Sequence, residues 1–249
     1  MPTFEELVDE GASVPVEGWD FSWFAGRATE DRPEWGYAKL MGERMATASA
    51  GLDIQTGGGE VLASIPKAPP LLAATESWPP NAAIARRTLA PLGGTVIEVG
   101  DLDDLPFADR TFDLVVSRHP ADLRWDEVAR VLAPGGAFFS QQVGAGSVRE
   151  MTDFMMGPQE VSMDRAPSVA IKDARQAGLD VIDLRTARLR MTFSDVGAVV
   201  HFLRKVFWIV PDFTVDRYHD KLVAMHRLIT EEGRFVAHST RFLIEARRA

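Results

Sequence analysis

The stretch Leu52–Asp53–Ile54–Gln55–Thr56–Gly57–Gly58–Gly59 reads as a short apolar strand that continues into a glycine-rich turn. Consecutive glycines let a backbone pass close to a ligand, and a helix beginning after them would present its N-terminus there. We expect that helix to begin near Glu60 and to end before Pro66. A tight strand-to-helix turn without a ligand is the plainer interpretation, and the turn alone does not decide between the two.

Two nucleotide-binding motifs can be tested against this turn. The dinucleotide fingerprint needs a third glycine three positions after the second, and counting from Gly57 and Gly59 that position is Leu62. A phosphate-binding P-loop needs Gly-Lys followed by Ser or Thr, and this triplet occurs nowhere in the chain. The turn therefore favours a ligand without a pyrophosphate.

Short apolar segments and helical patterns alternate on both sides of the turn, which predicts βαβ units around a parallel sheet. The expected strands are 52–54, 71–75, 95–99, 112–117, 137–143, 180–184 and 235–246. The other expected helices are 79–89, 125–132, 169–177, 196–206 and 214–232, the last with Thr214 as its N-cap. The predicted fold class is α/β: a doubly wound, mostly parallel seven-stranded sheet with N-terminal and C-terminal helical additions.

Composition limits the classes of function. The 249 residues carry a formal net charge of −9 and contain no cysteine, which excludes disulfides, thiolate metal sites and cysteine nucleophiles. Nucleic-acid-binding proteins usually present a basic face, so scattered arginines in an acidic chain favour a small or neutral partner. No apolar segment approaches the roughly 20 residues that span a bilayer, and the acidic N-terminal segment lacks a signal pattern. We expect a cytoplasmic protein without a membrane partner.

An acidic residue ends the second expected strand. Glu76 lies 17 residues after Gly59, and in doubly wound sheets a carboxylate at this place can accept both hydroxyls of a ribose. Its plainer interpretation is a carboxylate favoured by the N-terminus of the following helix. The two interpretations are compatible.

Further along the chain, the phrases Leu105–Pro106–Phe107 to Phe112–Asp113 and Arg130–Val131–Leu132–Ala133–Pro134–Gly135–Gly136 follow in order. With the glycine turn and Glu76, this order resembles the class I S-adenosylmethionine-dependent methyltransferases, in the type whose phrases read LPF-x-D-x-x-FD and RVL-x-PGG. The resemblance covers about residues 50–145. It implies a Rossmann-like methyltransferase fold, S-adenosylmethionine as cofactor and S-adenosylhomocysteine as product.

The family's pattern also implies which residues bind the cofactor. Asp53 and the glycine turn would bind its methionine part, Glu76 the ribose, and Asp101 with the Leu102 backbone the adenine amino group. Side chains at the start of the second helix would lie along the ribose and adenine, and those after the fourth strand would face the methionine. The implied residues are Asp53, Gln55, Thr56, Gly57, Gly59, Glu76, Ser77, Asn81, Asp101, Leu102, Ser117 and Arg118.

One residue departs from the family's pattern. Gln55 stands where the first glycine of the turn is expected. A side chain at this position either narrows the cofactor pocket or requires a shifted turn, and both alternatives remain open.

His119 follows the fourth strand at the edge of the sheet where ligands bind, which makes it the candidate general base. A partly buried, hydrogen-bonded histidine is the equally supported alternative. Gln141 and Gln142 are unusual on a strand expected to be buried, and one of them is a candidate for a hydrogen bond near the active site. The remaining histidines have no metal-ligand spacing.

We expect one methyltransferase domain over 1–249. Residues 1–49 form an N-terminal helical cover, 50–145 the cofactor-binding core, and 146–249 the remainder of the sheet with a lid-like helical insertion at 195–232. We expect an acceptor pocket bounded by three parts of the chain: the His119 region, the aromatic segment from Trp23 to Tyr37, and the helix beginning near Asp195.

Three functions compete. The leading one is methyl transfer to an unidentified small-molecule acceptor. The second is methylation of ribosomal RNA, against which the acidic charge counts. The third is a protein that binds the cofactor or a partner without catalysis, which the departure at Gln55 makes a real alternative.

Overall fold

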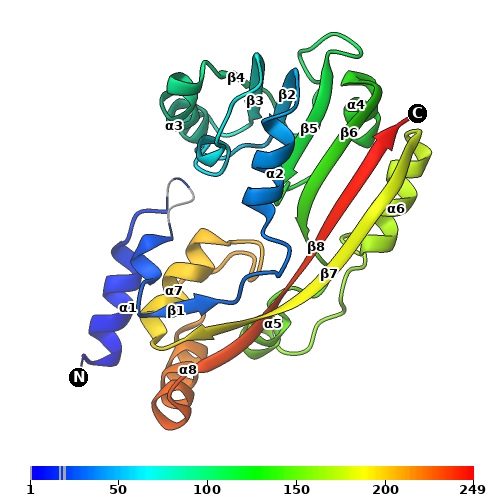
Figure 1. Ribbon diagram of the computed structural model, residues 1–249. Coiled ribbons are helices and arrows are strands. Elements are labelled where there is room, and N and C mark those ends of the chain that lie inside the picture. The colour runs from blue at the N-terminus through cyan, green and yellow to red at the C-terminus, as the bar shows by residue number, and fades with distance from the viewer. Residues whose placement is uncertain (1, 17, 19–20) are drawn as a thin grey trace. The chain divides into compact units, whose positions relative to one another are not determined.

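The computed structural model describes residues 2–16, 18 and 21–249, so that Trp19 of the N-terminal cover lies outside the described part (Figure 1). The contacts within the chain divide it into two compact units, each with its own apolar core. The first unit comprises residues 1–32, 146–162 and 188–240. The second unit comprises residues 33–145, 163–187 and 241–249.

The strands within the described residues form one sheet of eight, in the order β1-β7-β8-β6-β5-β2-β3-β4. Their bounds are β1 Ala28–Glu30, β2 Ala50–Ile54, β3 Leu71–Glu76, β4 Thr95–Glu98, β5 Phe112–Arg118, β6 Leu132–Val143, β7 Leu179–Phe193 and β8 Phe235–Arg248. The seven predicted strands are confirmed. The eighth, β1, has only three residues and pairs antiparallel with the end of β7, as Ala28 opposite Phe193 illustrates. A segment of this length shows no alternation from which a strand could be predicted.

The helices are α1 Phe4–Ser13, α2 Tyr37–Met45, α3 Pro79–Leu89, α4 Trp125–Val131, α5 Arg149–Met156, α6 Pro167–Gln176, α7 Val196–Lys205 and α8 His219–Glu232. Single 3₁₀ turns are η1 Ser22–Phe24, η2 Leu62–Ser64 and η3 Ala90–Leu92. Among the described residues, no helix is both long enough and apolar enough to cross a bilayer.

The centre of the second unit is a parallel sheet of five strands. β4, β3, β2, β5 and β6 pair in parallel, whereas β8 pairs antiparallel with β6. Parallel neighbours bring the carboxyl ends of β2 and β5 together, where Ile54 lies opposite Ser117. The predicted doubly wound, mostly parallel fold class is confirmed, with one strand more than expected.

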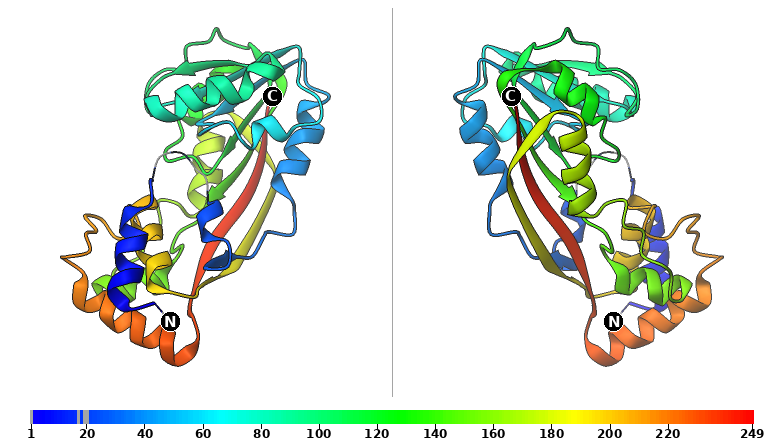
Figure 2. Two further views of the ribbon diagram at one scale, coloured as in Figure 1. Left: turned by 90° about the vertical axis from the view of Figure 1, so that its left-hand side faces the viewer. Right: turned by 90° about the vertical axis from the view of Figure 1, so that its right-hand side faces the viewer.

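Helices cover both faces of this sheet because the strands are apolar on both sides. Residues of α2 and α3 pack on one face, against Val116 and Phe139 among others. Residues of α4 and α6 pack on the other, against Val115 and Phe138 (Figure 2). Neighbouring strand residues point to opposite faces, so each strand contributes to both cores.

The prediction of an α-helix after the glycine turn is wrong. Residues from Glu60 to Pro66 contain only the 3₁₀ turn η2, in which the N–H of Ile65 bonds to the carbonyl of Leu62 at 3.2 Å. The segment is too short for a second helical turn before Pro66 removes a backbone donor. The glycine turn therefore has no α-helix N-terminus behind it.

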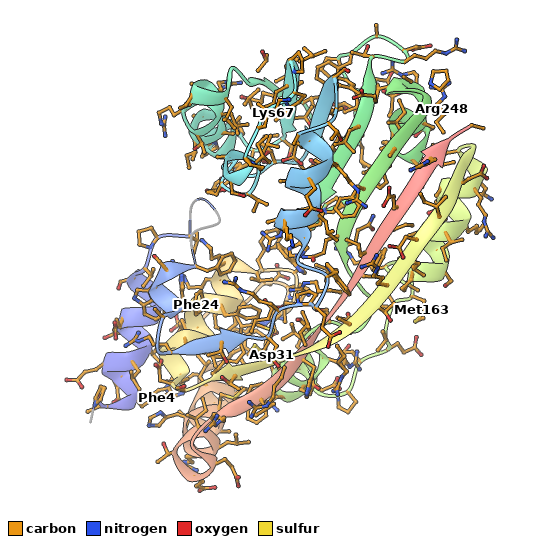
Figure 3. All side chains as sticks on the ribbon, in the orientation of Figure 1. Phe4, Phe24, Asp31, Lys67, Met163 and Arg248 are labelled. Atoms are coloured by element: carbon orange, nitrogen blue, oxygen red, sulfur yellow. The ribbon has the colours of Figure 1, made fainter. Side chains whose placement is uncertain are left out.

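Two further boundaries differ from the prediction. Thr214 does not cap α8, which begins at His219; its hydroxyl accepts the N–H of Arg217 in a separate turn. β6 begins at Leu132, directly after α4, rather than at the predicted residue 137, and its pairing with β5 shifts register between Leu132 and Ala137. Arg248, labelled in Figure 3, donates to the carbonyls of Arg130 (3.0 Å) and Leu132 (2.6 Å) and so binds the end of α4.

The first unit packs α1 directly on α7. A Cβ added to Gly11 of α1 would lie 2.2 Å from the carbonyl oxygen of Gly197 in α7. Asp195 caps α7 by accepting the N–H of Ala198 at 2.8 Å. Because Gly11 and Gly197 have no side chain, the backbones of α1 and α7 approach closely. The apolar core of the first unit forms around these two helices.

Candidate functional site

The glycine turn begins with a residue other than glycine in a left-handed backbone conformation. Gln55 has φ +57°, and Gly57 and Gly59 follow with φ +65° and +80°. The backbone N–H of Thr56 donates to the carbonyl of Thr75 at 2.9 Å, which ties the turn to the end of β3. A side chain at left-handed φ costs about 1–2 kcal/mol, and such positions cluster at functional sites.

The amide group of Gln55 compensates for part of this cost. Its Nε2 donates to the carbonyl of Asp122 at 2.6 Å, and its Oε1 accepts the backbone N–H of Ala121 at 2.7 Å. The side chain thus binds the loop that follows β5, defined here as the 120–123 loop. Of the two alternatives for the family's missing glycine, this geometry favours a turn adapted to the side chain.

Glu76 ends β3 beside the glycine turn. Its carboxylate is 6% exposed, and it accepts the N–H of Gly57 at 2.8 Å and that of Trp78 at 3.1 Å. Burial raises the pKa of Glu76, the hydrogen bonds from Trp78 and Gly57 oppose that shift, and the charge of Asp101 adds to it. The structure therefore brings Glu76 and the glycine turn together, as the sequence predicts.

Asp53 is a second buried carboxyl group at this edge. Its Oδ2 accepts the hydroxyl of Thr56 at 2.7 Å. Burial raises the pKa of Asp53 to about 7. The hydrogen bond from Thr56 opposes this shift, the negative charge of Glu76 adds to it, and the positive charge of Arg118 opposes it. Asp53 therefore titrates near neutral pH, with its charge sensitive to any cation that approaches.

Three buried oxygen atoms here have no hydrogen-bond partner among the described residues: Asn81 Oδ1, Asp101 Oδ1 and the Tyr37 hydroxyl. Asn81 lies in α3 and is 3% exposed, and Asp101 follows β4. Tyr37 stacks on Phe139 of β6 with ring centroids 5.3 Å apart. Buried polar atoms are nearly always paired in native proteins, so unpaired ones indicate where a polar ligand binds.

The other cofactor residues implied by the sequence take different environments. Ser77 adds its backbone N–H to the donors around Glu76. Leu102 is 64% exposed in the turn after Asp101. Ser117 is fully buried and donates its hydroxyl to the carbonyl of Ile54 at 2.8 Å, so it joins β5 to β2 and is already engaged.

His119 is the first residue after β5, next to the exposed Arg118. Its φ is +57°, and its backbone N–H donates to the carbonyl of Gln141 at 2.7 Å. Its Nε2 lies 2.8 Å from Nε2 of Gln141, whose Oε1 accepts the indole N–H of Trp35 at 2.7 Å. Burial lowers the pKa of His119 well below its usual value, and the charges of Arg118 and Arg241 add to that effect.

The pairing of His119, Gln141 and Trp35 has no signal in the sequence. Gln141 and Trp35 were each conspicuous, the first as a polar residue in a buried strand and the second as an aromatic residue in the N-terminal cover. Their separation of 106 residues gives no signal of pairing. The bonds from Gln55 to the 120–123 loop were missed for the same reason, and no local pattern could have revealed them.

A cavity of about 330 Å³ lies within the second unit against the 120–123 loop. Its lining includes Trp125 of α4, Val169 of α6, Phe242 of β8 and Gln142 of β6. The Nε2 of Gln142 is buried without a hydrogen-bond partner among the described residues. Of the parts expected to bound an acceptor pocket, Trp35, Tyr37 and His119 belong to the second unit, whereas Trp23 and Asp195 belong to the first.

Comparison with known proteins agrees with this geometry. Residues 52–140 match the family described as "Methyltransferase domain". The malonyl-[acyl-carrier protein] O-methyltransferase of Marinomonas sp. (strain MWYL1) is 26% identical over 167 residues, which are 62% of this chain and 62% of that protein. The chain thus spans less than two thirds of the length of this curated relative.

Two solved structures share the fold. A Bacillus halodurans C-125 protein proposed to be a methyltransferase superposes with a TM-score of 0.58 at 20% identity, covering 86% of this chain and 99% of that one. Geranyl diphosphate methyltransferase in complex with GPP and sinefungin superposes with a TM-score of 0.53 at 12% identity, covering 87% and 78%. Residues 52–140 thus match a methyltransferase domain, and the chain shares the fold of these solved structures.

Proposed function

We propose that this chain transfers a methyl group from S-adenosylmethionine to a small or carrier-linked acceptor molecule. The observation that carries the proposal is the group of acceptor atoms around the glycine turn. Glu76 lies against Gly57, and Asp101 and Asn81 each hold a buried oxygen without a partner among the described residues. A nucleoside with ribose hydroxyls and an exocyclic amine has the donors that these atoms require.

The residues fit the cofactor group by group. Glu76 would accept the ribose hydroxyls with the lone pairs that its bonds to Gly57 and Trp78 leave free. Asp101 would accept the adenine amino group, and Asn81 would lie along the nucleoside. The adapted turn at Gln55 and Thr56 would hold the methionine part. The sinefungin complex of a protein with this fold supports the assignment, since sinefungin is an analogue of S-adenosylmethionine.

The cofactor, when bound, supplies an activated methyl group on a sulfonium. The protein's task is then to align the acceptor's lone pair behind that methyl carbon and to exclude water. In the transfer, the acceptor would bond to the methyl carbon while the carbon–sulfur bond breaks and leaves its electrons on sulfur. Positioning of this kind can supply about 7–11 kcal/mol in favourable cases.

The nature of the acceptor rests on two observations. The net charge of −9 disfavours RNA, because phosphate contacts need a basic surface. The relative from Marinomonas is named for methylation of a malonyl group on a carrier protein, which supports an acceptor of small size. A non-catalytic binding protein is the remaining alternative, and a cytoplasmic location remains a prediction.

Calorimetry with S-adenosylmethionine, followed by transfer of a radiolabelled methyl group, tests the proposal. Binding together with labelled product from small acids supports it. Binding without transfer to any acceptor would favour the non-catalytic alternative. Methyl transfer to ribosomal RNA, with an RNA affinity that falls steeply as the salt concentration rises, would instead favour an RNA methyltransferase.

A further inference from the structure

The hydrogen bonds around His119 fix its protonation state. The indole N–H of Trp35 is a donor only, so the atom of Gln141 that lies 2.7 Å from it must be the carbonyl oxygen Oε1. The other end of the same amide is then the NH₂ group, which lies 2.8 Å from Nε2 of His119. An amide nitrogen has no lone pair to offer, so His119 Nε2 must accept and cannot carry a proton.

The proton of the neutral ring is consequently on Nδ1. A positive ring, with protons on both nitrogens, would turn a donor against the amide of Gln141. The surrounding charges act in the same direction, because Arg118 and Arg241 both lower the pKa of His119. The lone pair needed by a general base is thus already occupied, and the free function of the ring is the Nδ1–H donor.

We propose that His119 is a positioning residue, held by Gln141 and Trp35 as a neutral Nδ1–H donor, and that it binds an acceptor molecule whose nucleophile is a carboxylate. This inference rests on the proposed methyl transfer. With no base at His119, the acceptor that needs least from this residue is one whose reacting atom already carries an available lone pair at neutral pH. A carboxylate oxygen does so, and it is attracted by the exposed Arg118 and by the Nδ1–H group.

In this reaction a carboxylate oxygen bonds to the methyl carbon, the carbon–sulfur bond breaks with its electrons on sulfur, and the products are a methyl ester and S-adenosylhomocysteine. No proton is transferred in the step. A phenol or a protonated amine would instead have to lose its proton to a base. The tautomer of His119 and the charge of Arg118 together favour a carboxylate acceptor.

Nitrogen NMR of the ¹⁵N-labelled protein tests the tautomer without any need for activity. We expect the His119 ring to show a protonated Nδ1 and an unprotonated Nε2 at neutral pH. In Gln141→Glu the carboxylate can only accept, so the proton should move to Nε2. The matched control is Gln142→Glu, one residue along β6 on the opposite face, which should leave the His119 signals unchanged. A wild-type ring with its proton on Nε2 would overturn the assignment.

Two substitutions of His119 distinguish a hydrogen-bond donor from a general base at this position. The amide nitrogen of Asn occupies nearly the position of Nδ1, whereas that of Gln occupies nearly the position of Nε2. We expect His119→Asn to keep turnover on a carboxylic acid acceptor within about tenfold of wild type and His119→Gln to lose more. A loss of about a hundredfold or more in both variants, rescued by raised pH, would identify a base and overturn the proposal.

The two hypotheses fail in distinguishable ways. Absence of S-adenosylmethionine binding in the wild-type protein would refute the proposed function and leave the NMR result on the tautomer intact. Methyl transfer to amines or phenols, but not to acids, would keep the proposed function and refute the carboxylate acceptor.

Discussion

Gln55 donates a 2.6 Å hydrogen bond from its side chain to the backbone carbonyl of Asp122, across the carboxyl edge between β2 and β5. The residue that stands where the family's pattern has a glycine therefore links the glycine turn to the 120–123 loop. The link has opposing energetic consequences. Left-handed φ at Gln55 destabilises the fold, while two side-chain hydrogen bonds stabilise it.

Replacement of Gln55 separates these two contributions. Gln55→Ala loses both hydrogen bonds and keeps the backbone strain, so its free energy of unfolding should fall by about 1–3 kcal/mol. Gln55→Gly loses the same bonds but removes the strain, and we expect it to be about 1 kcal/mol more stable than the alanine variant. Urea denaturation measures both. Equal stability of the two variants would mean that φ at this position is not strained.

Glu76 should matter for both binding and stability. Glu76→Ala removes the acceptor that we propose for the ribose hydroxyls, and we expect S-adenosylmethionine to bind more weakly by about 1.5–3 kcal/mol, roughly ten- to a hundredfold in Kd. The variant also leaves the N–H groups of Gly57 and Trp78 without their partner, so it should be less stable, though folded. Calorimetry and denaturation report the two effects separately.

The control for this variant is Glu98→Ala. Glu98 lies opposite Glu76 in the β3–β4 register, but its side chain is 44% exposed and meets Arg86 at 3.6 Å. An exposed ion pair of this kind contributes little. If Glu98→Ala weakens the cofactor as much as Glu76→Ala does, the effect is general and the ribose is bound elsewhere.

Asp53 makes stability depend on pH. Its pKa rises from 3.8 in the unfolded chain to about 7 in the folded protein, mainly through burial. The folded state therefore binds more protons between these values, and the free energy of unfolding should fall as pH rises from about 4 to 7, by at most about 1.4 kcal/mol per pH unit from this group. Above pH 7 the contribution is constant.

Asp53→Asn removes this titration and keeps an acceptor for Thr56. Relative to wild type, the variant should gain stability with rising pH up to about 7 and no further. Denaturation curves at several pH values give the difference. A difference that is constant over the whole range would show that Asp53 is ionised in the folded protein throughout.

The helix contact in the first unit predicts a large effect of a small substitution. In Gly11→Ala the new methyl group would meet the backbone of Gly197 at 2.2 Å, so α1 and α7 must move apart. We expect a loss of about 1–3 kcal/mol. Asp9→Ala, at an exposed position of the same helix, is the control and should change stability by less than about 0.5 kcal/mol. Thermal unfolding of both variants checks the difference.

The sequence predicted those parts of the fold that depend on local pattern. Alternating apolar segments located seven strands, and the position of Glu76 after the second predicted strand brought it to the glycine turn because parallel strands end at one edge. The short strand β1 was not predicted, and an α-helix was predicted where the structure has the 3₁₀ turn η2. Such short segments are decided by hydrogen bonds to distant residues rather than by their own periodicity.

In the candidate site, too, locally determined features could be predicted and features that depend on distant residues could not. Glycine and carboxylate positions could be predicted because the turn and the strand end constrain them locally. The hydrogen-bond partners of Gln55 and His119 could not, although a hydrogen-bonded His119 was one of the two alternatives, since each partner lies elsewhere in the chain: Asp122 for the first and Gln141 for the second. A hydrogen bond of this kind leaves no trace in composition or spacing.

The crossover from β2 to β3 has one further consequence. With η2 as its only helical element, this segment lacks the continuous hydrogen-bond ladder of the strands that it joins and should open at lower free energy than they do. A nucleoside bound to Glu76 and the glycine turn would hold the start of this crossover against the end of β3. Cofactor occupancy should therefore slow hydrogen–deuterium exchange in the crossover, first in the residues that follow Gly57, and so make a segment without an α-helix a reporter of the bound nucleoside.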